Sequence, residues 1–394
     1  MALCACSQGR TVHGGEEVQV ASAMVPTAGA SATTQTAVAS AMPTQQVTAT
    51  DSVRHDTLTF AMVGDIMPGT TYPSPRLPKE GGRLLFRHCD SLLHAADVAM
   101  GNLEGVMCEG GTSTNIGNPT GYSFRIPPSY AGIFPEAGFD YLNLANNHLR
   151  DFGPYGYELT QHILDSIQMP YSGIKGGKRY SIIERRGVRI GICSFGQNEY
   201  CYQHTVDSAI YNGILRELRA ACDLMVVSIH GGAEGVKAAH LPYDQEYYVG
   251  EKRGKLREFA HHCIDMGADL IHGHGPHVPR AVELYKGRFI AYSLGNFCTP
   301  FGLNIKGMCG HAPLITVRLT DDGRFVDGQI HSFVQVYGDG PKLDPLNAAA
   351  KDIRQLTAED IRDSQLRFEE TGASSFFTIH PHLLPVHDID ARGE

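Results

Sequence analysis

The segment LTFAMVGD at residues 58–65 is an apolar run that ends in a glycine and an aspartate. Its length and its bounding glycine predict a buried β-strand. Asp65 then lies at the carboxyl end of that strand, which is where ligands bind in α/β sheets. One polar residue at a strand end proves little, so its meaning depends on the other strands of the chain.

Four further segments repeat this pattern of an apolar run that ends in a polar cluster. They are DVAMGNLE at 97–104, YLNLANNH at 141–148, LMVVSIH at 224–230 and DLIHGHGPH at 269–277. A lone histidine at a strand end is more often a satisfied or exposed side chain, but five such ends in one chain are hard to obtain by chance. We therefore expect one pocket that collects Asp65, Glu104, Asn147, His148, His230, His274 and His277.

The chemistry of these side chains points to a metal. Carboxylate oxygens and imidazole nitrogens suit divalent manganese, zinc or iron. The sequence therefore predicts a divalent metal site with one or two ions. Two ions would clamp a substrate and activate a water for attack on a phosphorus or acyl centre.

The apolar runs alternate with segments of helical period, so the predicted fold class is α/β with buried strands. The folded domain is predicted over residues 57–340, and residues 341–394 are predicted to form a helical, polar extension. Helices are expected near 84–95, 129–137, 155–168, 207–221 and 244–265, and further strands near 180–184, 188–194, 278–285, 288–294, 314–319 and 327–336.

The composition limits the possible function classes. The chain has 394 residues, of which 42% are hydrophobic, and this is enough for a large core. Its net charge of −9 argues against a nucleic-acid partner. The ten cysteines form no CxxC pair, and those in apolar patterns, such as Cys193 and Cys263, are expected to be buried thiols. The sequence has no run of 18 apolar residues that would predict a membrane-spanning helix.

Residues 1–56 have a different character from the rest of the chain. LCAC at residues 3–6 is similar to the end of a bacterial lipobox, in which small residues precede a lipidated cysteine. Residues 8–55 are rich in Ala, Thr, Ser and Gln, as in a disordered tether. We expect a lipid-anchored, extracytoplasmic protein of the cell envelope whose signal peptide lies upstream, and an ordinary cytosolic start is the alternative.

Taken together, the motifs resemble the CapA family of poly-γ-glutamate capsule synthesis. The segments that carry the resemblance are GDIM at 64–67, NLE at 102–104, NLANNHLRDFG at 143–153, SIHGGAE at 228–234, GHGPHV at 273–278 and IAYSLGNF at 290–297. The resemblance covers residues 58–335 and implies a fold like that of the calcineurin-like metallophosphoesterases. This fold is an αββα sandwich, in which two facing mixed sheets are flanked by helices.

The resemblance also implies roles for the strand-end residues. Asp65 and His277 match ligands of a first metal, and Glu104 matches the carboxylate that bridges two metals. His148 matches the general acid that protonates the leaving group. Ligands of a second metal are matched by Asn147, His230 and His274.

The sequence departs from the phosphoesterase pattern at three places. Met67 stands where those enzymes usually have a histidine, Glu104 replaces an aspartate, and His277 follows His274 by three residues instead of two. A site with a single ion is therefore an alternative, and His277 is either a ligand or a contact to substrate.

Other polar residues complete the candidate site. Asp151 and Glu234 join His148 as catalytic candidates, although helix capping and a solvated loop are the alternatives. Arg125 is a candidate grip for a substrate carboxylate or phosphate, with a loop-pinning salt bridge as the alternative. Asn102 and Asn296 are candidate substrate-binding residues that could instead hold a turn and shape the pocket floor. His272 is expected to be a buried histidine that does not bind metal.

Two functions from different classes follow. The first is a metal-dependent hydrolase acting on a phosphoester or an anionic polymer in capsule synthesis or export. The second is a non-catalytic factor that binds polymer or assembles the membrane components of a capsule synthase.

Overall fold

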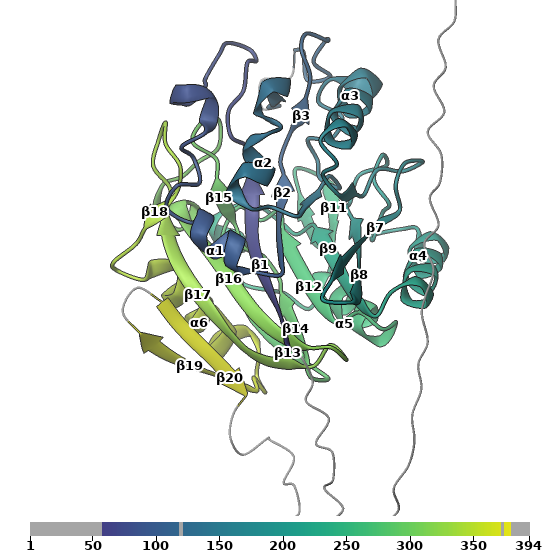
Figure 1. Ribbon diagram of the computed structural model, residues 1–394, viewed down its shortest axis with the longest axis vertical. Coiled ribbons are helices and arrows are strands. Elements are labelled where there is room, and N and C mark those ends of the chain that lie inside the picture. The colour runs from purple at the N-terminus through teal and green to yellow at the C-terminus, as the bar shows by residue number, and fades with distance from the viewer. Residues whose placement is uncertain (1–56, 118–120, 372–373, 380–394) are drawn as a thin grey trace, which may run out of the picture. The chain divides into compact units, whose positions relative to one another are not determined.

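The computed structural model describes residues 57–117, 121–371 and 374–379. The lipobox-like segment and the tether expected over residues 1–56 lie outside this part of the chain. Within it, no helix combines the length and the hydropathy needed to cross a bilayer. Two large mixed sheets dominate the structure (Figure 1).

The larger sheet is built around β1, which carries Asp65 near its end. β1 pairs in parallel with β2 and with β15, and it pairs in antiparallel with β16. The order across the sheet is β19 (Leu366–Thr371), β20 (Ser374–Ile379), β17 (Phe325–Val334), β16 (His311–Thr320), β1 (Thr57–Ile66), β2 (Val98–Leu103), β5 (Tyr141–Asn143) and β6 (Tyr171–Ser172), with β15 (Asn296–Cys298) beside β1 and β18 (Lys342–Leu343) beside β17.

The smaller sheet contributes the two histidine-bearing strands. Its central strands β8, β9, β12 and β14 run parallel, and the two edge strands run antiparallel to them. The order is β13 (Val282–Tyr285), β14 (Arg288–Ala291), β12 (Leu270–His274), β9 (Leu224–His230), β8 (Val188–Phe195) and β7 (Tyr180–Arg185). A short parallel pair, β3 (Val106–Met107) with β4 (Arg125–Ile126), lies outside both sheets.

Three apolar clusters hold the layers together, because successive residues of a strand point to opposite faces of its sheet. Phe60 and Met62 pack between the two sheets against Val226 of β9. Ala61 and Val63 point outward, to the helices α1 (Asp90–Ala95), α2 (Ile133–Ala137) and α3 (Gly153–Ser166). The smaller sheet packs its outer face against α4 (Ser208–Ala221) and α5 (Leu256–Asp265). This arrangement of helix, sheet, sheet and helix confirms the predicted fold class.

One predicted helix is partly wrong. The pattern over 244–265 predicts a single long helix, but only its second half forms α5. The first half is a hairpin of β10 (Glu246–Tyr248) and β11 (Glu251–Gly254). Its turn places Val249 and Gly250 at φ values of 48° and 80°, which a helix cannot contain.

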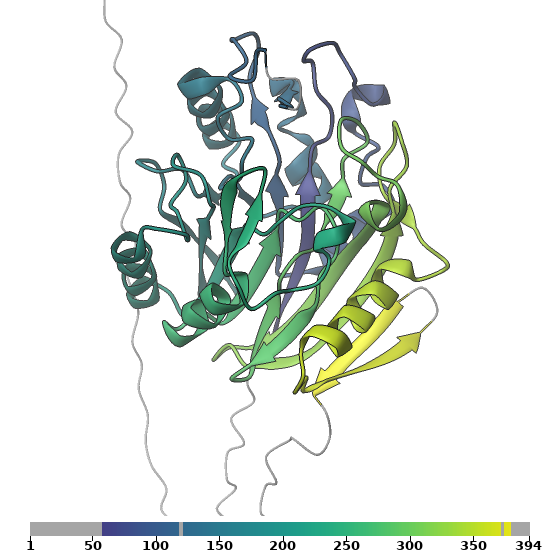
Figure 2. The ribbon, with the colours of Figure 1, turned by 180° about the vertical axis from the view of Figure 1, so that it is seen from behind.

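The segment after residue 340 contains more than the expected helix. It includes α6 (Ala348–Asp360), which packs against β13, β16 and β17. Strands β18, β19 and β20 of the same segment join the larger sheet through β17. Figure 2 shows α6 lying next to the β19–β20 hairpin. Short 3₁₀ turns connect other elements, at η1 (Lys79–Gly82), η2 (Pro128–Tyr130), η3 (Val236–Ala238) and η4 (Gly307–Gly310).

Candidate metal centre

Strand register brings the predicted ligands together. In the larger sheet, Asp65 lies opposite Asn102 of β2 and opposite Asn296 of β15. In the smaller sheet, His230 lies opposite His274. The backbone at this edge is tightly packed, since a Cβ on Gly64 would lie 1.8 Å from the carbonyl oxygen of Gly295. Glycine at position 64 therefore allows the close approach that presents Asp65.

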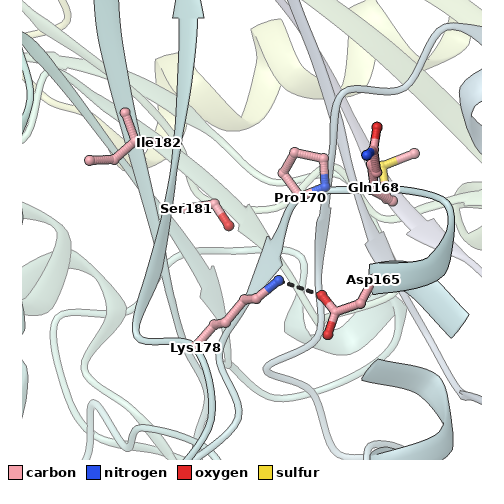
Figure 3. Close-up of a pocket in the computed structure, with 7 residues that line it drawn as sticks. Asp165, Gln168, Pro170, Lys178, Ser181 and Ile182 are labelled. Atoms are coloured by element: carbon pink, nitrogen blue, oxygen red, sulfur yellow. Dashed lines mark hydrogen bonds and ion pairs between the residues drawn. The ribbon is translucent and has the colours of Figure 1, made fainter. Parts of the chain in front are cut away.

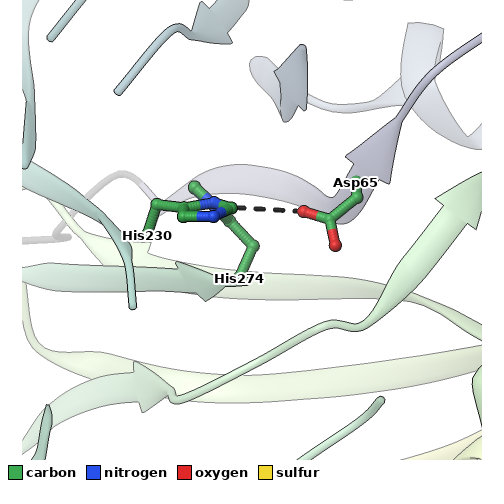
Figure 4. Close-up of side chains that lie close together, drawn as sticks. All are labelled: Asp65, His230 and His274. Atoms are coloured by element: carbon green, nitrogen blue, oxygen red, sulfur yellow. Dashed lines mark hydrogen bonds and ion pairs between the residues drawn. The ribbon is translucent and has the colours of Figure 1, made fainter. Parts of the chain in front are cut away.

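Three buried side chains form the centre of the pocket. Asp65, His230 and His274 are each 0% exposed, and one ligand atom from each lies within 4.8 Å of the others. Nδ1 of His230 is 2.9 Å from Nδ1 of His274. Nδ1 of His274 is 4.0 Å from Oδ1 of Asp65. Figure 4 shows the two imidazoles close together and the carboxylate of Asp65 facing them.

The donor set fits a metal ion. Nε2 of His230 is 2.8 Å from Oδ1 of Asn147, an acceptor, so Nε2 carries the proton and Nδ1 is unprotonated. The amide of Asn102 lies 3.5 Å from that Nδ1. Burial lowers the pKa of both His230 and His274 well below the usual range, which keeps the rings neutral, as ligation requires. Neutral imidazole nitrogens and a carboxylate oxygen are ligand types that zinc and similar divalent ions take in proteins.

Glu104 supplies a second indication that the site suits a cation. The residue is 0% exposed, and its Oε1 has no hydrogen-bond partner among the described residues. Its Oε2 accepts from the amide of Asn102 and is 3.8 Å from Nδ1 of His230. Burial, together with the charge of Asp65, raises the pKa of Glu104 to about 8. A bound cation would satisfy the free oxygen and favour the ionised carboxylate.

His277 lies in the pocket but has a different environment. Its Nδ1 donates to Oδ2 of Asp65 at 2.9 Å and lies 2.9 Å from Oδ1 of Asn296. Its Nε2 is 3.7 Å from Oε2 of Glu234. Burial alone would lower the pKa of His277, but these contacts and the charges of Asp65, Glu104 and Glu234 raise it to about 10. The side chain is thus a cation paired with Asp65, and the backbone presents it at a φ of 60°.

His148 and Asp151 form a hydrogen-bonded pair beside Glu104. Nδ1 of His148 is 2.9 Å from Oδ2 of Asp151, and that oxygen also accepts from the backbone N–H of Phe124 at 2.6 Å. Nε2 of His148 is 3.8 Å from Oε1 of Glu104. Burial opposes the protonation of His148, but the carboxylates of Asp151 and Glu104 raise its pKa above the usual value. Asp151 therefore orients His148 and keeps a proton available on Nε2.

Asn102 connects the two carboxylates of the pocket. Its Nδ2 donates to Oδ1 of Asp65 at 2.8 Å and also contacts Glu104. Its Oδ1 accepts from Nδ2 of Asn143 at 2.6 Å and from Nδ2 of Asn146 at 3.0 Å. The sequence reasoning did not include Asn143 and Asn146, although three asparagines within five residues of a strand end are a usable signal.

Asn296 and Glu234 lie at the side of the pocket occupied by His277. Nδ2 of Asn296 donates to the carbonyls of Asn304 and Cys309, each at 3.2 Å, which fixes the orientation of its amide. Oε1 of Glu234 accepts from Arg253 at 2.8 Å.

The structure places Arg125 in contact with loop backbone and aromatic rings. Its guanidinium donates to the hydroxyl of Thr71 at 2.8 Å and to the carbonyl of Gly110 at 3.0 Å. The same group lies over the rings of Tyr72 and Phe152, at 5.7 and 5.2 Å from the centroids. These contacts hold three loops together, and they involve no carboxylate.

A surface hollow elsewhere has none of this chemistry. It has a volume of about 270 Å³ and is lined by residues of α3, β7 and the loops next to them, including Asp165 and Lys178. Figure 3 shows the ion pair between these two side chains at its edge. None of the predicted site residues lines it.

Known proteins resemble this chain in the region that holds the pocket. The family model for the bacterial capsule synthesis protein PGA_cap matches residues 59–300. The PGA biosynthesis protein CapA of Bacillus subtilis (strain 168) is 28% identical over 267 residues, which cover 61% of this chain and 63% of that protein. The capsule biosynthesis protein CapA of Bacillus anthracis is 28% identical over 276 residues, which cover 64% of this chain and 63% of that protein.

The chain thus spans less than two thirds of the length of these relatives. Among solved structures, a phosphatase from Mycoplasma pneumoniae aligns with a TM-score of 0.46 at 15% identity, covering 75% of this chain and 99% of that one. The family match includes every residue of the metal pocket described above. The chain belongs to the bacterial capsule synthesis protein PGA_cap family.

Proposed function

We propose that this protein is a metal-dependent hydrolase of the phosphoesterase type, acting on an anionic polymer or phosphoester in capsule synthesis or export. One observation carries the proposal: the buried imidazoles of His230 and His274 converge with Asp65 next to a carboxylate oxygen of Glu104 that has no hydrogen-bond partner among the described residues. Such a set is costly to bury unless a cation completes it.

A divalent ion held by Asp65, His230, His274 and Glu104, with Asn147 beside it, would supply Lewis-acid activation of a water or of a substrate oxygen. His148 holds a proton on Nε2 and donates it to the leaving oxygen. Asp151 fixes the tautomer of His148, because it accepts a hydrogen bond from Nδ1–H. Asn102 keeps the carboxylates of Asp65 and Glu104 at a fixed spacing.

The environment of His277 favours one tightly bound ion over two. The imidazolium of His277 donates to Oδ2 of Asp65, so that oxygen already has a cationic partner. Met67, where phosphoesterases usually have a histidine, adds no nitrogen ligand at that position. We propose that His277, with Glu234 next to it, meets the substrate, and that Arg125 and Asn296 shape the surface through which the substrate enters.

The cellular setting is part of the same proposal. The family membership supports a role at the cell envelope, next to the membrane components of a capsule synthase. The lipobox-like residues 3–6 support attachment to a lipid.

The experiment is to load the metal-free protein with Mn²⁺ or Zn²⁺ and to assay phosphoesters and γ-glutamyl polymers. We expect His148→Ala to keep its metal and to lose about 10²- to 10⁴-fold in kcat, since it removes only a proton donor. His230→Ala should lose both metal and turnover. A wild-type protein that neither binds metal nor turns over any of these substrates would refute the proposal.

A non-catalytic role in polymer binding or assembly is the second candidate, and the ion pair between His277 and Asp65 favours it. That pair places a cation in the pocket without any metal. The same assay separates the candidates: polymer binding by metal-free protein that His277→Gln abolishes, without turnover under any metal, identifies the binding role.

A further inference from the structure

We infer that Ser228 and His272 are positioning residues, which fix the ring proton of His274 on Nε2 and leave its Nδ1 free to bind the metal. This inference rests on the proposed metal site. It concerns two residues that contribute no ligand atom to that site, one of which the sequence predicts to be a buried histidine without a metal role.

The inner face of the smaller sheet changes from apolar to polar side chains along β9 and β12. Because side chains alternate, Val226, Ser228 and His230 of β9 share one face, and their partners across the register lie on the same face of β12. Val226 belongs to the apolar cluster between the sheets, and His230 belongs to the metal pocket. Ser228 and His272 are opposite each other at the step between these two zones.

A chain of three hydrogen bonds runs through this step. Nε2 of His272 lies 2.7 Å from the carbonyl oxygen of Val63, in the facing sheet. Nδ1 of His272 lies 3.1 Å from Oγ of Ser228. The same hydroxyl lies 2.9 Å from Nε2 of His274. This hydrogen-bond chain therefore links the backbone of β1 to the imidazole ring of His274, a proposed metal ligand on β12.

The direction of the chain is set at the end where Val63 lies. A carbonyl only accepts, so Nε2 of His272 must donate to it. A buried His272 whose two hydrogen-bond partners are uncharged is disfavoured as a cation, so its Nδ1 is an acceptor. The hydroxyl of Ser228 then donates to His272, and its oxygen accepts a hydrogen bond from Nε2–H of His274.

The consequence lies on the other side of the His274 ring. With the proton on Nε2, the lone pair of Nδ1 faces Nδ1 of His230, 2.9 Å away, and Oδ1 of Asp65 is 4.0 Å away. Two nitrogen lone pairs at this distance repel each other, and a cation bound by both would remove the repulsion. The opposite direction of the hydrogen-bond chain would put the proton on Nδ1 of His274, and that nitrogen could then not bind a metal. Ser228 and His272 are both 0% exposed, so no solvent contact competes with the chain.

The test compares Ser228→Ala with a matched control, Ser194→Ala. Ser194 lies opposite Ser228 in the register of the neighbouring strand, is equally buried, and bonds to the hydroxyl of Tyr141 instead of to a pocket residue. Zn²⁺ affinity of the metal-free protein is measured by competition with a chromophoric chelator. We expect Ser228→Ala to weaken binding about 10- to 100-fold, as loss of such a partner does elsewhere, and Ser194→Ala to change it by less than about threefold.

His272→Leu should weaken Zn²⁺ binding at least as much, because it reverses the direction of the hydrogen-bond chain. With no acceptor at position 272, the hydroxyl of Ser228 can donate to Nε2 of His274 and push the proton onto Nδ1. The readout specific to positioning is the ¹⁵N spectrum of the metal-free, histidine-labelled protein, with the His274 signals assigned by their loss in His274→Asn. We expect the Nε2–H tautomer in wild type and the Nδ1–H tautomer in His272→Leu.

An Nδ1–H tautomer of His274 in wild type, or unchanged Zn²⁺ affinity in Ser228→Ala, would overturn the inference. If Ser228 and His272 are only structural, Ser228→Ala and His272→Leu will lower the melting temperature without changing the tautomer of His274. That result would also overturn the inference. If wild type binds no Zn²⁺, the proposed function fails, while the ¹⁵N spectrum still decides whether the chain sets the tautomer.

Discussion

The two sides of the pocket use the same residue type in opposite ways. On the side of the smaller sheet, His230 and His274 are fully buried, and burial lowers their pKa values well below the usual range. On the side of the larger sheet, His277 bonds to Asp65 and its pKa is raised to about 10. The first side presents neutral lone pairs, whereas the second holds a fixed positive charge.

The difference shows that a histidine at a strand end does not by itself indicate a ligand. The partner of the other ring nitrogen decides its role. Oδ1 of Asn147 accepts a hydrogen bond from Nε2 of His230 on the side away from the pocket centre, so the inner nitrogen is unprotonated. Asp65 and Asn296 both accept at Nδ1 of His277, so that nitrogen is a donor.

The largest expected effect is on the neutral side. His230→Ala or His274→Ala removes a ligand, so Zn²⁺ affinity should fall by more than about 100-fold, beyond the loss expected for an outer partner. His262→Ala is the control, since His262 bonds to Asn212 of α4 and lies outside the pocket. Isothermal titration of metal-free protein measures the affinities. Retained affinity in either ligand variant would remove the distinction between the two sides.

A smaller effect, on stability, is expected on the charged side. His277→Gln leaves Asp65 buried without its cation, so the metal-free protein should lose about 3 kcal/mol in its free energy of unfolding. Saturating Zn²⁺ should recover most of this loss, because the ion then faces Asp65. Urea unfolding with and without metal measures both values. If His277→Gln instead lowers the number of bound ions from two to one, His277 is a ligand and the comparison is wrong.

The smallest expected effect concerns His331, a buried histidine outside the metal pocket, and it tests whether burial without ligation affects metal binding. His331 lies on β17, and burial lowers its pKa to about 4. Its unfolded form binds a proton near pH 6.5 while the folded form stays neutral, so stability falls as the pH drops from 6.5 to 4. His331→Gln should therefore be more stable than wild type at pH 5, by on the order of 1 kcal/mol, and equal to it in Zn²⁺ affinity. A changed Zn²⁺ affinity in His331→Gln would show that a buried histidine can alter metal binding without being a ligand.

Sequence reasoning identified the pocket because its signal is local. Each apolar run ends where its strand ends, and the parallel strands of both sheets end at the pocket, so Asp65, Glu104, His230 and His274 could be grouped without a structure. The hairpin over 246–254 was not predicted because alternating and helical patterns are hard to separate in a short, half-exposed segment. Strands β19 and β20 were not predicted because they are the outermost two strands at one end of the larger sheet and carry many polar residues.

The sequence by itself determined the α/β class, the family and the set of side chains that could bind a metal, because these depend on residue type and on spacing along the chain. Only the tertiary structure decided which of them have free lone pairs. That property depends on the second hydrogen-bond partner of each ring, and for His274 the partner is Ser228, on the neighbouring strand. For His277 the partner is Asp65, 212 residues away, on the facing sheet.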